Sequence, residues 1–327
     1  MSCERILVTG GTGFIGSHVV PLLRRASAAP HGPALRLLTH HRPGPGATGG
    51  GPEAVPGDLA DPASLHGVCE GVTTVLHLAA RIGGTREECR TVNEEGTRAL
   101  LAEAARAGVR RIVQLGTAAV YGDGPHRGEP EGRIAEAPVS PTSETRLAGE
   151  RLVLAAGGTV VRPYLVYGEG DTWVVPGLVQ LVRRLPHWVD GAAARLSLIP
   201  ATVLARALAE LALAPAGREP AAGRVLHAAH PEPVTLRDLV TTVCGALDLP
   251  LPAGELPLDE ALRRLDAHGP GARRPLALVA VDRFYDSGAL WSLLSTGPGA
   301  PFAQAFGDCA PWYRRALAGG GRTPSAV

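Results

Sequence analysis

Short apolar runs alternate with amphipathic segments through the first half of the chain. The apolar runs are Arg5–Thr9, Leu35–Thr39, Val72–Leu78, Arg111–Leu115 and Thr159–Val161. Apolar residues at helical spacing separate them, at Phe14–Arg25, Pro62–Val68, Thr91–Ala107 and Ser143–Ala156. Strands that alternate with helices predict a parallel sheet covered by helices on both faces. Two stretches dense in glycine and proline, 41–57 and 122–136, are predicted loops.

The regular alternation ends near Gly168. Two helices are predicted beyond it, at Asp171–Arg184 and Val203–Leu213, together with one more strand at Arg224–Ala229. From His230 onward the chain has short helical segments and a proline-rich stretch. We therefore expect a smaller unit in this half, with a few of its elements returning to the sheet.

Composition excludes several classes of protein. The 32 basic and 31 acidic residues give a net charge of +1, and no basic cluster points to nucleic acid as a partner. No signal peptide and no apolar run near the roughly 20 residues of a membrane span are present, so we expect a cytoplasmic protein without a membrane partner. The five cysteines are scattered, which argues against disulfides and a metal site. Every basic residue is an arginine, and the chain contains no lysine.

The first predicted strand runs into a glycine-rich turn. It reads Thr9-Gly10-Gly11-Thr12-Gly13-Phe14-Ile15-Gly16, and a helical pattern follows. Such glycines permit a tight turn, approach of the backbone to a pyrophosphate, and close packing of helix on strand. An ordinary glycine-rich loop is the alternative, but the strand before the turn and the helix after it favour a dinucleotide site.

These patterns together predict the architecture. We expect an α/β fold with a Rossmann-type doubly wound parallel sheet and a smaller C-terminal substrate lobe. Residues 1–168 are predicted to form the dinucleotide-binding domain, with 198–229 returning to it. Residues 169–197 and 230–327 are predicted to form the substrate-binding lobe.

The glycine motif and several later stretches resemble the extended short-chain dehydrogenase/reductase family of epimerases, dehydratases and reductases. The matching stretches are Gly57-Asp58-Leu59-Ala60-Asp61, Leu76-His77-Leu78-Ala79-Ala80, Val92-Asn93-Glu94-Glu95-Gly96-Thr97, Val120-Tyr121-Gly122 and Arg162-Pro163-Tyr164-Leu165-Val166-Tyr167-Gly168. The likeness extends over nearly the whole chain. It implies a cofactor site that contains Gly10, Thr12, Gly13, Phe14, Ile15, Gly16, Asp58, Leu59, Leu78, Ala79, Ala80, Pro163 and Val166.

The end of the second strand bears on the choice of cofactor. NAD-specific sites usually have an acidic residue there to hold the ribose 2′-hydroxyl. This chain has Thr39 followed by His40, His41 and Arg42. Potential cations without a carboxylate favour a 2′-phosphate, so we expect NADPH/NADP⁺. The alternative is that these residues only face solvent in a loop.

The resemblance breaks at the catalytic residues. Members of the family use a Ser or Thr to position the substrate oxygen, a Tyr to transfer a proton and a Lys to lower the pKa of that Tyr. Thr117, four residues before Tyr121, matches the first role. The stretch Ser140-Pro141-Thr142-Ser143-Glu144-Thr145-Arg146-Leu147-Ala148-Gly149-Glu150 matches the family on both flanks. It places Thr142 where the Tyr belongs and Arg146 where the Lys belongs.

This substitution changes what the site can do. An aliphatic hydroxyl is a far weaker acid than a phenol, so Thr142 is no comparable proton donor. Arg146 stays protonated and can hydrogen-bond a ribose or a developing anion. Tyr164 or Tyr167 as a relocated acid, and His187 near the substrate lobe, are weaker alternatives.

The pattern of losses resembles the atypical ketoreductases that tailor aromatic polyketides such as angucyclinones in antibiotic biosynthesis. That resemblance implies an NADPH-dependent reductase of a small aromatic ketone whose own phenol supplies the proton. The alternatives are a non-catalytic NADP-binding sensor or scaffold, and a nucleotide-sugar epimerase or dehydratase. The sequence leaves open whether the protein is a monomer or a homodimer.

Overall fold

The larger of two packed bodies is built on a seven-stranded parallel sheet. The computed structural model describes residues 4–40, 52–215, 222–269 and 271–318. The sheet order is β12-β7-β5-β4-β1-β2-β3. The strands are β1 (Arg5–Thr9), β2 (Ala34–Thr39), β3 (Glu53–Pro56), β4 (Thr74–His77), β5 (Arg111–Leu115), β7 (Thr159–Pro163) and β12 (Val225–Ala228). Chain order reverses between β1 and β4, which is where Rossmann-type sheets open a crevice for a dinucleotide.

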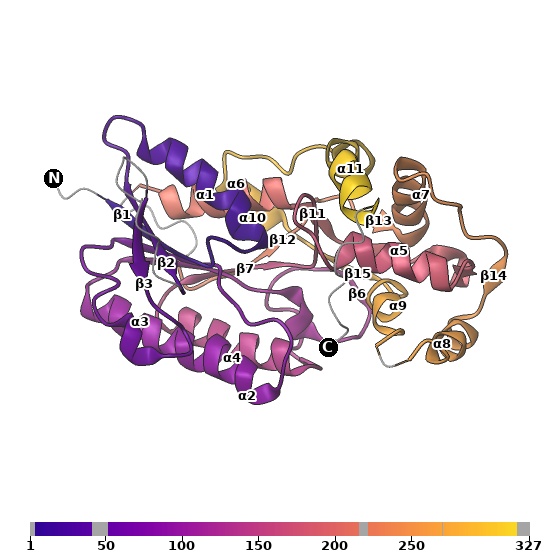
Figure 1. Ribbon diagram of the computed structural model, residues 1–327, viewed down its shortest axis with the longest axis horizontal. Coiled ribbons are helices and arrows are strands. Elements are labelled where there is room, and N and C mark those ends of the chain that lie inside the picture. Colours follow the sequence, from indigo (N-terminus) through magenta and orange to yellow (C-terminus); the bar gives the residue numbers. More distant parts are fainter. Residues whose placement is uncertain (1–3, 41–51, 216–221, 270, 319–327) are drawn as a thin grey trace.

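Helices cover both faces of this sheet (Figure 1). On one face lie α1 (Phe14–Ser27), α6 (Ala201–Leu213) and α10 (Gly288–Leu293). On the other lie α2 (Arg86–Arg90), α3 (Thr97–Arg106) and α4 (Pro141–Ala155). The apolar stripe of α1, made of Ile15, Val19 and Leu23, packs in the core formed with β1 and α6. This two-sided burial explains why the strands read as continuous apolar runs.

The smaller body lies beyond the carboxyl ends of the strands and is mainly helical (Figure 1). Its helices are α5 (Val174–Arg184), α7 (Leu236–Ala246), α8 (Leu258–Asp266), α9 (Arg274–Val279) and α11 (Phe302–Ala318). A four-stranded sheet joins β13 (Val234–Thr235), β10 (Arg195–Leu196), β15 (Arg283–Tyr285) and β6 (His126–Glu129). Two short pairs are β8 (Leu165–Tyr167) with β11 (Leu198–Pro200), and β9 (Trp188–Val189) with β14 (Glu255–Leu256).

The predicted α/β class and doubly wound sheet are confirmed, whereas three local predictions are wrong and a fourth, a helix over Thr91–Ala107, is confirmed with a different first turn. The predicted loops contain β3 and β6, which are four-residue strands too short to give an apolar pattern. Predicted helix Pro62–Val68 is only a short 3₁₀ turn, η1 (Pro62–Leu65). Predicted helix Thr91–Ala107 begins with a π turn, η2 (Thr91–Gly96), before α3. At Gly96 a Cβ would lie 2.4 Å from the carbonyl oxygen of Leu59, so the backbone of η2 packs closely against the segment that contains Leu59.

One element assigned to the lobe packs elsewhere. Leu290 of α10 is fully buried in the core on the α1 face of the large sheet, although 230–327 was expected to form the lobe. The apolar residues of α10 contact β12 because the chain crosses back over the sheet before it enters α11. Among the described residues no helix is long and apolar enough to cross a membrane.

Candidate active site

The glycine-rich turn has the geometry of a pyrophosphate cradle. Gly10 has φ +70°, and a Cβ there would lie 2.6 Å from the amide nitrogen of Ala79. A Cβ at Gly16 would lie 2.1 Å from the carbonyl oxygen of Gly10. Gly13 caps the start of α1, and no side chain occupies that helix end as a cap. Both Thr12 and Gly13 are exposed, so the amides of this first turn can reach an anion.

Two predicted residues beyond the turn lie at the start of α1 and differ in exposure. Phe14 is half-buried and its ring lies beside the ring of His18, with centroids 6.0 Å apart. Ile15 is buried in the core between α1 and the sheet. Phe14 is therefore accessible to a ligand at the start of α1, whereas the side chain of Ile15 is not.

The end of β4 lies against the glycine-rich turn at the same edge of the sheet. Leu78 is buried, and the amide of Ala79 donates to the hydroxyl of Thr9 at 3.2 Å, with Ala80 next along the chain. Pro163 ends β7 and is buried, while Val166 lies half-buried in β8. The predicted residues from β1, β4 and β7 therefore gather at the carboxyl edge of one sheet.

His77, which the sequence left without a role, holds this edge together. Its Nδ1 lies 2.7 Å from Thr9 Oγ1 and its Nε2 lies 3.0 Å from Thr97 Oγ1. Thr97 already donates its hydroxyl proton to the carbonyl of Asn93, so it must accept from Nε2–H. Nδ1 then accepts from Thr9, which fixes a neutral tautomer. Burial, with a smaller effect of Arg146, lowers the pKa of His77 to about 4.

The predicted cofactor-selecting residues are only partly described. His40 follows β2, and its Nε2 lies 2.7 Å from Oδ2 of Asp58. Asp58 Oδ1 also accepts from the amide of Ala60, and the neighbouring Leu59 is buried. His41 and Arg42 lie outside the described residues. The end of β2 therefore carries an exposed histidine–carboxylate pair.

The hydroxyl of Thr117 can donate a hydrogen bond to a ketone oxygen. It follows β5 and caps a 3₁₀ turn, η3 (Ala118–Tyr121). Its Oγ1 accepts the amide proton of Ala119 at 3.2 Å. No described residue accepts its hydroxyl proton, so this half-buried O–H can donate to a substrate carbonyl.

Thr142 is bound to the loop after β4. Its Oγ1 accepts the amide proton of Gly83 at 3.1 Å and lies 3.8 Å from the sulfur of Cys89. Asn93 binds the same loop, because its side chain accepts from the amide of Arg81 and donates to the carbonyl of Arg81. Thr142 thus holds a loop in place where the family has its proton donor.

Arg146 is tied to the backbone at the end of β5. Its Nη2 donates to the carbonyls of Leu115 at 2.9 Å and Gly116 at 2.8 Å. Its Nε and Nη1 have no acceptor among the described residues, so they remain available to a ribose or an anion. Burial lowers the pKa of Arg146 and the Glu150 carboxylate opposes that shift, so the group stays a cation.

The weaker candidates for a relocated acid have other contacts. Tyr164 donates its hydroxyl to the carbonyl of Leu278 at 2.6 Å and accepts from Arg283 Nη1 at 3.0 Å. Burial raises the pKa of Tyr167, whose side chain lies in the lobe core. His187 borders an apolar pocket between α5 and α7, formed with Leu181, Val240 and others. None of the three combines an accessible proton with a position beside Thr117.

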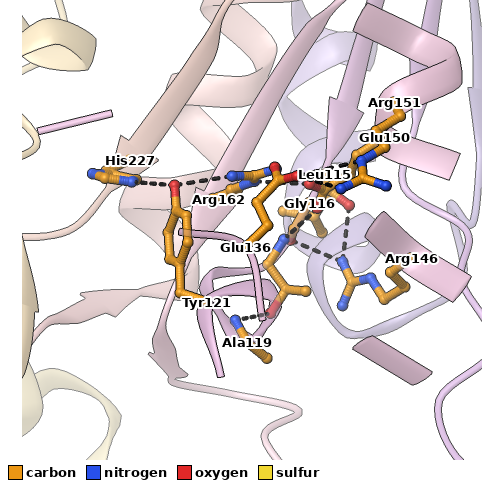
Figure 2. Close-up of polar contacts among 11 residues, drawn as sticks. Leu115, Gly116, Ala119, Tyr121, Glu136, Arg146, Glu150, Arg151, Arg162 and His227 are labelled. Atoms are coloured by element: carbon orange, nitrogen blue, oxygen red, sulfur yellow. Dashed lines mark hydrogen bonds and ion pairs between the residues drawn. The ribbon is translucent and has the colours of Figure 1, made fainter. Parts of the chain in front are cut away.

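A buried polar chain beside Thr117 was missed by sequence reasoning. Figure 2 shows that it runs from Glu150 through Arg162 and Tyr121 to His227. Arg162 donates to Glu150 at 2.7 Å and to the Tyr121 hydroxyl at 2.9 Å. His227 Nδ1 lies 3.0 Å from the carbonyl of Asp286, so it donates there and its Nε2 accepts from Tyr121 at 2.7 Å. Glu150 and Arg162 both stood in matched family stretches, which was the available signal.

The rim near Thr142 is apolar. Ile82 is 58% exposed and Val139 is 53% exposed, on the two segments that Thr142 joins. Exposed large apolar side chains at a candidate site are typical of contact with an apolar ligand.

Comparison with known proteins supports the resemblance seen in the sequence. Residues 6–198 match the NAD dependent epimerase/dehydratase family. The chain is 33% identical to 2-alkyl-3-oxoalkanoate reductase of Stenotrophomonas maltophilia, over 75% of this chain and 76% of that protein. It is 28% identical to 4-hydroxy-2-methyl-3-oxo-4-farnesyl-3,4-dihydroquinoline-1-oxide ketoreductase of Stigmatella aurantiaca, over 85% of each.

A solved structure shows the same fold. MoeE5 in complex with UDP-glucose and NAD superposes with a TM-score of 0.71 at 24% identity, over 96% of this chain and 100% of that one. The family match, together with the glycine turn and the sheet order, settles the classification. The chain belongs to the NAD dependent epimerase/dehydratase family and is a nicotinamide-dependent oxidoreductase of the extended short-chain dehydrogenase/reductase type.

Proposed function

We propose that this protein is an NADPH-dependent ketoreductase that reduces a carbonyl of an aromatic polyketide of the angucyclinone kind, in antibiotic biosynthesis. The observation that carries the proposal is the position of Thr142. By its match to the family's motif, Thr142, which accepts from the Gly83 amide, replaces the proton donor, while the hydroxyl proton of Thr117 has no acceptor among the described residues. The site can therefore bind a ketone oxygen but has no phenol of its own there to protonate it.

The substrate's own phenol is the proposed proton source. Bound NADPH supplies the hydride that adds to the carbonyl carbon. Thr117 donates a hydrogen bond to the carbonyl oxygen, which accumulates negative charge as the C=O π bond breaks. A phenol next to that oxygen transfers its proton and completes the new O–H bond. The resulting phenolate takes a proton from water on release, and the free N–H groups of Arg146 stabilise it until then.

The apolar rim and the relatives support this class of substrate. Ile82 and Val139 offer apolar contact to a polycyclic ring on the side of Thr142. The Stigmatella relative is named as a ketoreductase of an oxo-dihydroquinoline, and the Stenotrophomonas relative as a reductase of an oxoalkanoate. Both names describe reduction of a ketone, which favours a reductase over an epimerase or dehydratase. Those two reactions also need a base that removes a hydroxyl proton, and the Thr142–Arg146 pair is not one.

The cofactor is proposed to be NADPH. His40 carries an imidazole beside Asp58 at the adenosine end of the crevice, and Arg42 follows two residues later. Arg42 would give a 2′-phosphate a charge-assisted hydrogen bond that a 2′-hydroxyl lacks, whereas a phosphate would compete with Asp58 for the imidazole of His40. The structure with the same fold is named with NAD, so the two cofactors need to be compared directly.

Turnover of paired ketones tests the proposal. The protein is incubated with NADPH and an aromatic ketone that has a phenol next to the carbonyl, and nicotinamide absorbance is followed. We expect oxidation with the phenol and loss of turnover with its methyl ether. Equal rates on the phenol and the ether would disprove the substrate-derived proton.

A non-catalytic NADP-binding sensor is the second candidate. This candidate is favoured because Thr142 and Arg146 both bind backbone groups, and a protein that only binds NADP would also need such structural contacts. Tight NADPH binding without oxidation by any phenolic ketone would support the sensor and overturn the reductase.

A further inference from the structure

Glu150 is a fully buried carboxylate directly behind the residue that binds the ketone in the proposed reaction. We propose that Glu150 is a positioning residue, which fixes the Thr117 hydroxyl at the end of β5 through the Thr117 amide. Its Oε1 accepts the amide proton of Thr117 at 3.0 Å, and its side chain is 0% exposed. The inference rests on the proposed role of Thr117 and adds a residue that acts through it.

Two side chains one helical turn apart hold two consecutive peptide groups after β5. Arg146 and Glu150 stand at i and i+4 on α4, so they project from one face of the helix. Arg146 binds the carbonyls of Leu115 and Gly116, and Glu150 binds the amide of Thr117. The backbone that carries the Thr117 hydroxyl is thus fixed by donors on one side and an acceptor on the other.

Gly116 leaves space for the hydrogen bond between Glu150 and the Thr117 amide. A Cβ at that position would lie 2.4 Å from Oε1 of Glu150 and 2.7 Å from a methyl of Val160. Any larger residue would push the carboxylate off the Thr117 amide. The glycine therefore allows the carboxylate to pass directly under the strand end.

Arg162 orients the carboxylate from the neighbouring strand. Its Nε donates to Oε2 of Glu150 at 2.7 Å, which leaves Oε1 to the Thr117 amide. Each of its two Nη nitrogens also donates once, Nη1 to Tyr121 at 2.9 Å and Nη2 to Glu136 at 2.7 Å. Since β5 and β7 are adjacent, the sheet holds Arg162 beside the end of β5, where Thr117 follows.

Charge explains why a carboxylate is needed in this position. Two donors, the Thr117 amide and the Arg162 Nε–H, point at the same group and require two acceptor oxygens. A glutamine offers one oxygen and one NH₂ group, so one donor would face another donor. Glu150 also lies between two guanidiniums, which oppose the rise in its pKa caused by burial.

A double-mutant cycle separates positioning from simple support of the fold. Glu150→Asp keeps the charge beside Arg162 but draws the carboxylate back from the Thr117 amide. We expect it to lower kcat on the phenolic ketone by about 10- to 100-fold, as misplacements near 1 Å do. KM for NADPH should change less than about two-fold, since the contact does not touch the cofactor crevice. In a Thr117→Ala background the same change should alter kcat less than about two-fold, because the hydroxyl is gone.

Glu103 provides the matched control. It is a buried carboxylate on α3 that accepts from the amide of Gly67 at 2.9 Å and from Arg106 at 2.8 Å, remote from Thr117. Glu103→Asp should lower the melting temperature to a similar degree and leave kcat unchanged. The proposal would be overturned if Glu150→Asp lowered kcat by the same factor in the wild type and in Thr117→Ala. It would also be overturned if Glu150→Asp left kcat of the wild type unchanged.

A second readout does not depend on activity. The amide proton resonance of Thr117 should lie downfield in the wild type, because its acceptor is a carboxylate, and move upfield in Glu150→Asp or Glu150→Gln. If no ketone is reduced, the proposed function fails while this shift still tests the contact. An unmoved Thr117 resonance in both variants would show that Glu150 does not hold the amide. Glu150→Gln replaces Glu150→Asp in the cycle if the latter does not fold.

Discussion

The backbone amide of Gly83 donates a hydrogen bond to the hydroxyl of Thr142, over 3.1 Å between nitrogen and oxygen. This contact joins the first turn of α4 to the loop after β4, which carries the exposed side chain of Ile82. The residue that replaces the family's tyrosine therefore shapes the rim of the site. Its aliphatic hydroxyl is a far weaker acid than the phenol it replaces, so Thr142 holds the loop and does not take over the tyrosine's proton transfer.

Thr142→Val should retain most of the activity. The change removes one neutral hydrogen bond, which is worth about 1 kcal/mol of unfolding free energy. We expect kcat on a phenolic ketone to fall less than about three-fold, with a small rise in KM as the Ile82 loop loosens. Thr142→Ser keeps the hydroxyl and serves as the control. Collapse of single-turnover hydride transfer in the valine variant alone would mean that Thr142 takes part in proton transfer.

Cofactor preference should depend on the residues after β2. In His40→Ala/Arg42→Ala the 2′-phosphate loses charge-assisted contacts, each worth roughly 1.5–3 kcal/mol. The KM for NADPH should rise at least about 10-fold, while the KM for NADH stays within about two-fold. His66→Ala, an exposed histidine after η1, is the control for a lost surface imidazole. A wild type that prefers NADH would contradict the prediction.

The sequence predicted the architecture more completely than it predicted the contacts of the candidate site. Strand Arg5–Thr9 and its glycine turn were predictable because apolar runs and glycine spacing are local signals. The contact between Gly83 and Thr142 joins positions 59 residues apart, and nothing in either segment's pattern specifies it. The same holds for Glu150 and Thr117, where the motif matches marked the residues but not the contact. Side-chain partners across elements depend on packing that only the folded chain supplies.

Stability should fall as the pH drops from about 6.5 to about 4, partly because of His77. Burial holds its pKa at about 4 in the folded protein, against 6.5 for an ordinary histidine. Between these values the unfolded chain binds the proton that the folded chain refuses, so protonation favours unfolding. His77 therefore contributes about 3 kcal/mol to the unfolding free energy above pH 6.5, and this contribution is lost as the pH falls toward 4. Arg146 is the charged group that acts on it, and it disfavours the imidazolium at every pH in this range.

Urea unfolding of the wild type and of His77→Gln at pH 7 and pH 5 measures how much His77 contributes to the pH dependence of the unfolding free energy. The glutamine cannot take up a proton, so its loss of stability between the two pH values should be smaller than that of the wild type. Burial also lowers the pKa of His126 and His227, and both variants retain that common slope. Equal pH slopes for the two proteins would exclude His77 as a contributor.

The hydroxyl of Tyr285 should be dispensable for stability. Its ring packs among those of Tyr121, Tyr164 and His227, with centroids 5.2–5.8 Å away. Its buried Oη has no hydrogen-bond partner among the described residues. Burying an unpaired hydroxyl costs free energy, so Tyr285→Phe should leave the unfolding free energy unchanged or raise it by up to about 1 kcal/mol.

Tyr313→Phe is the matched control for that change. Tyr313 is equally buried, but its hydroxyl donates to Asp171 at 2.8 Å and accepts from the amide of Gly168 at 2.8 Å. Removing it leaves the buried Gly168 amide without its acceptor and takes one of four donors from the buried Asp171 carboxylate, which should cost about 1–3 kcal/mol in urea unfolding. A loss of that size in Tyr285→Phe would show that its hydroxyl has a partner, such as a buried water bound between Tyr285 and the equally unpaired Nε2 of His126.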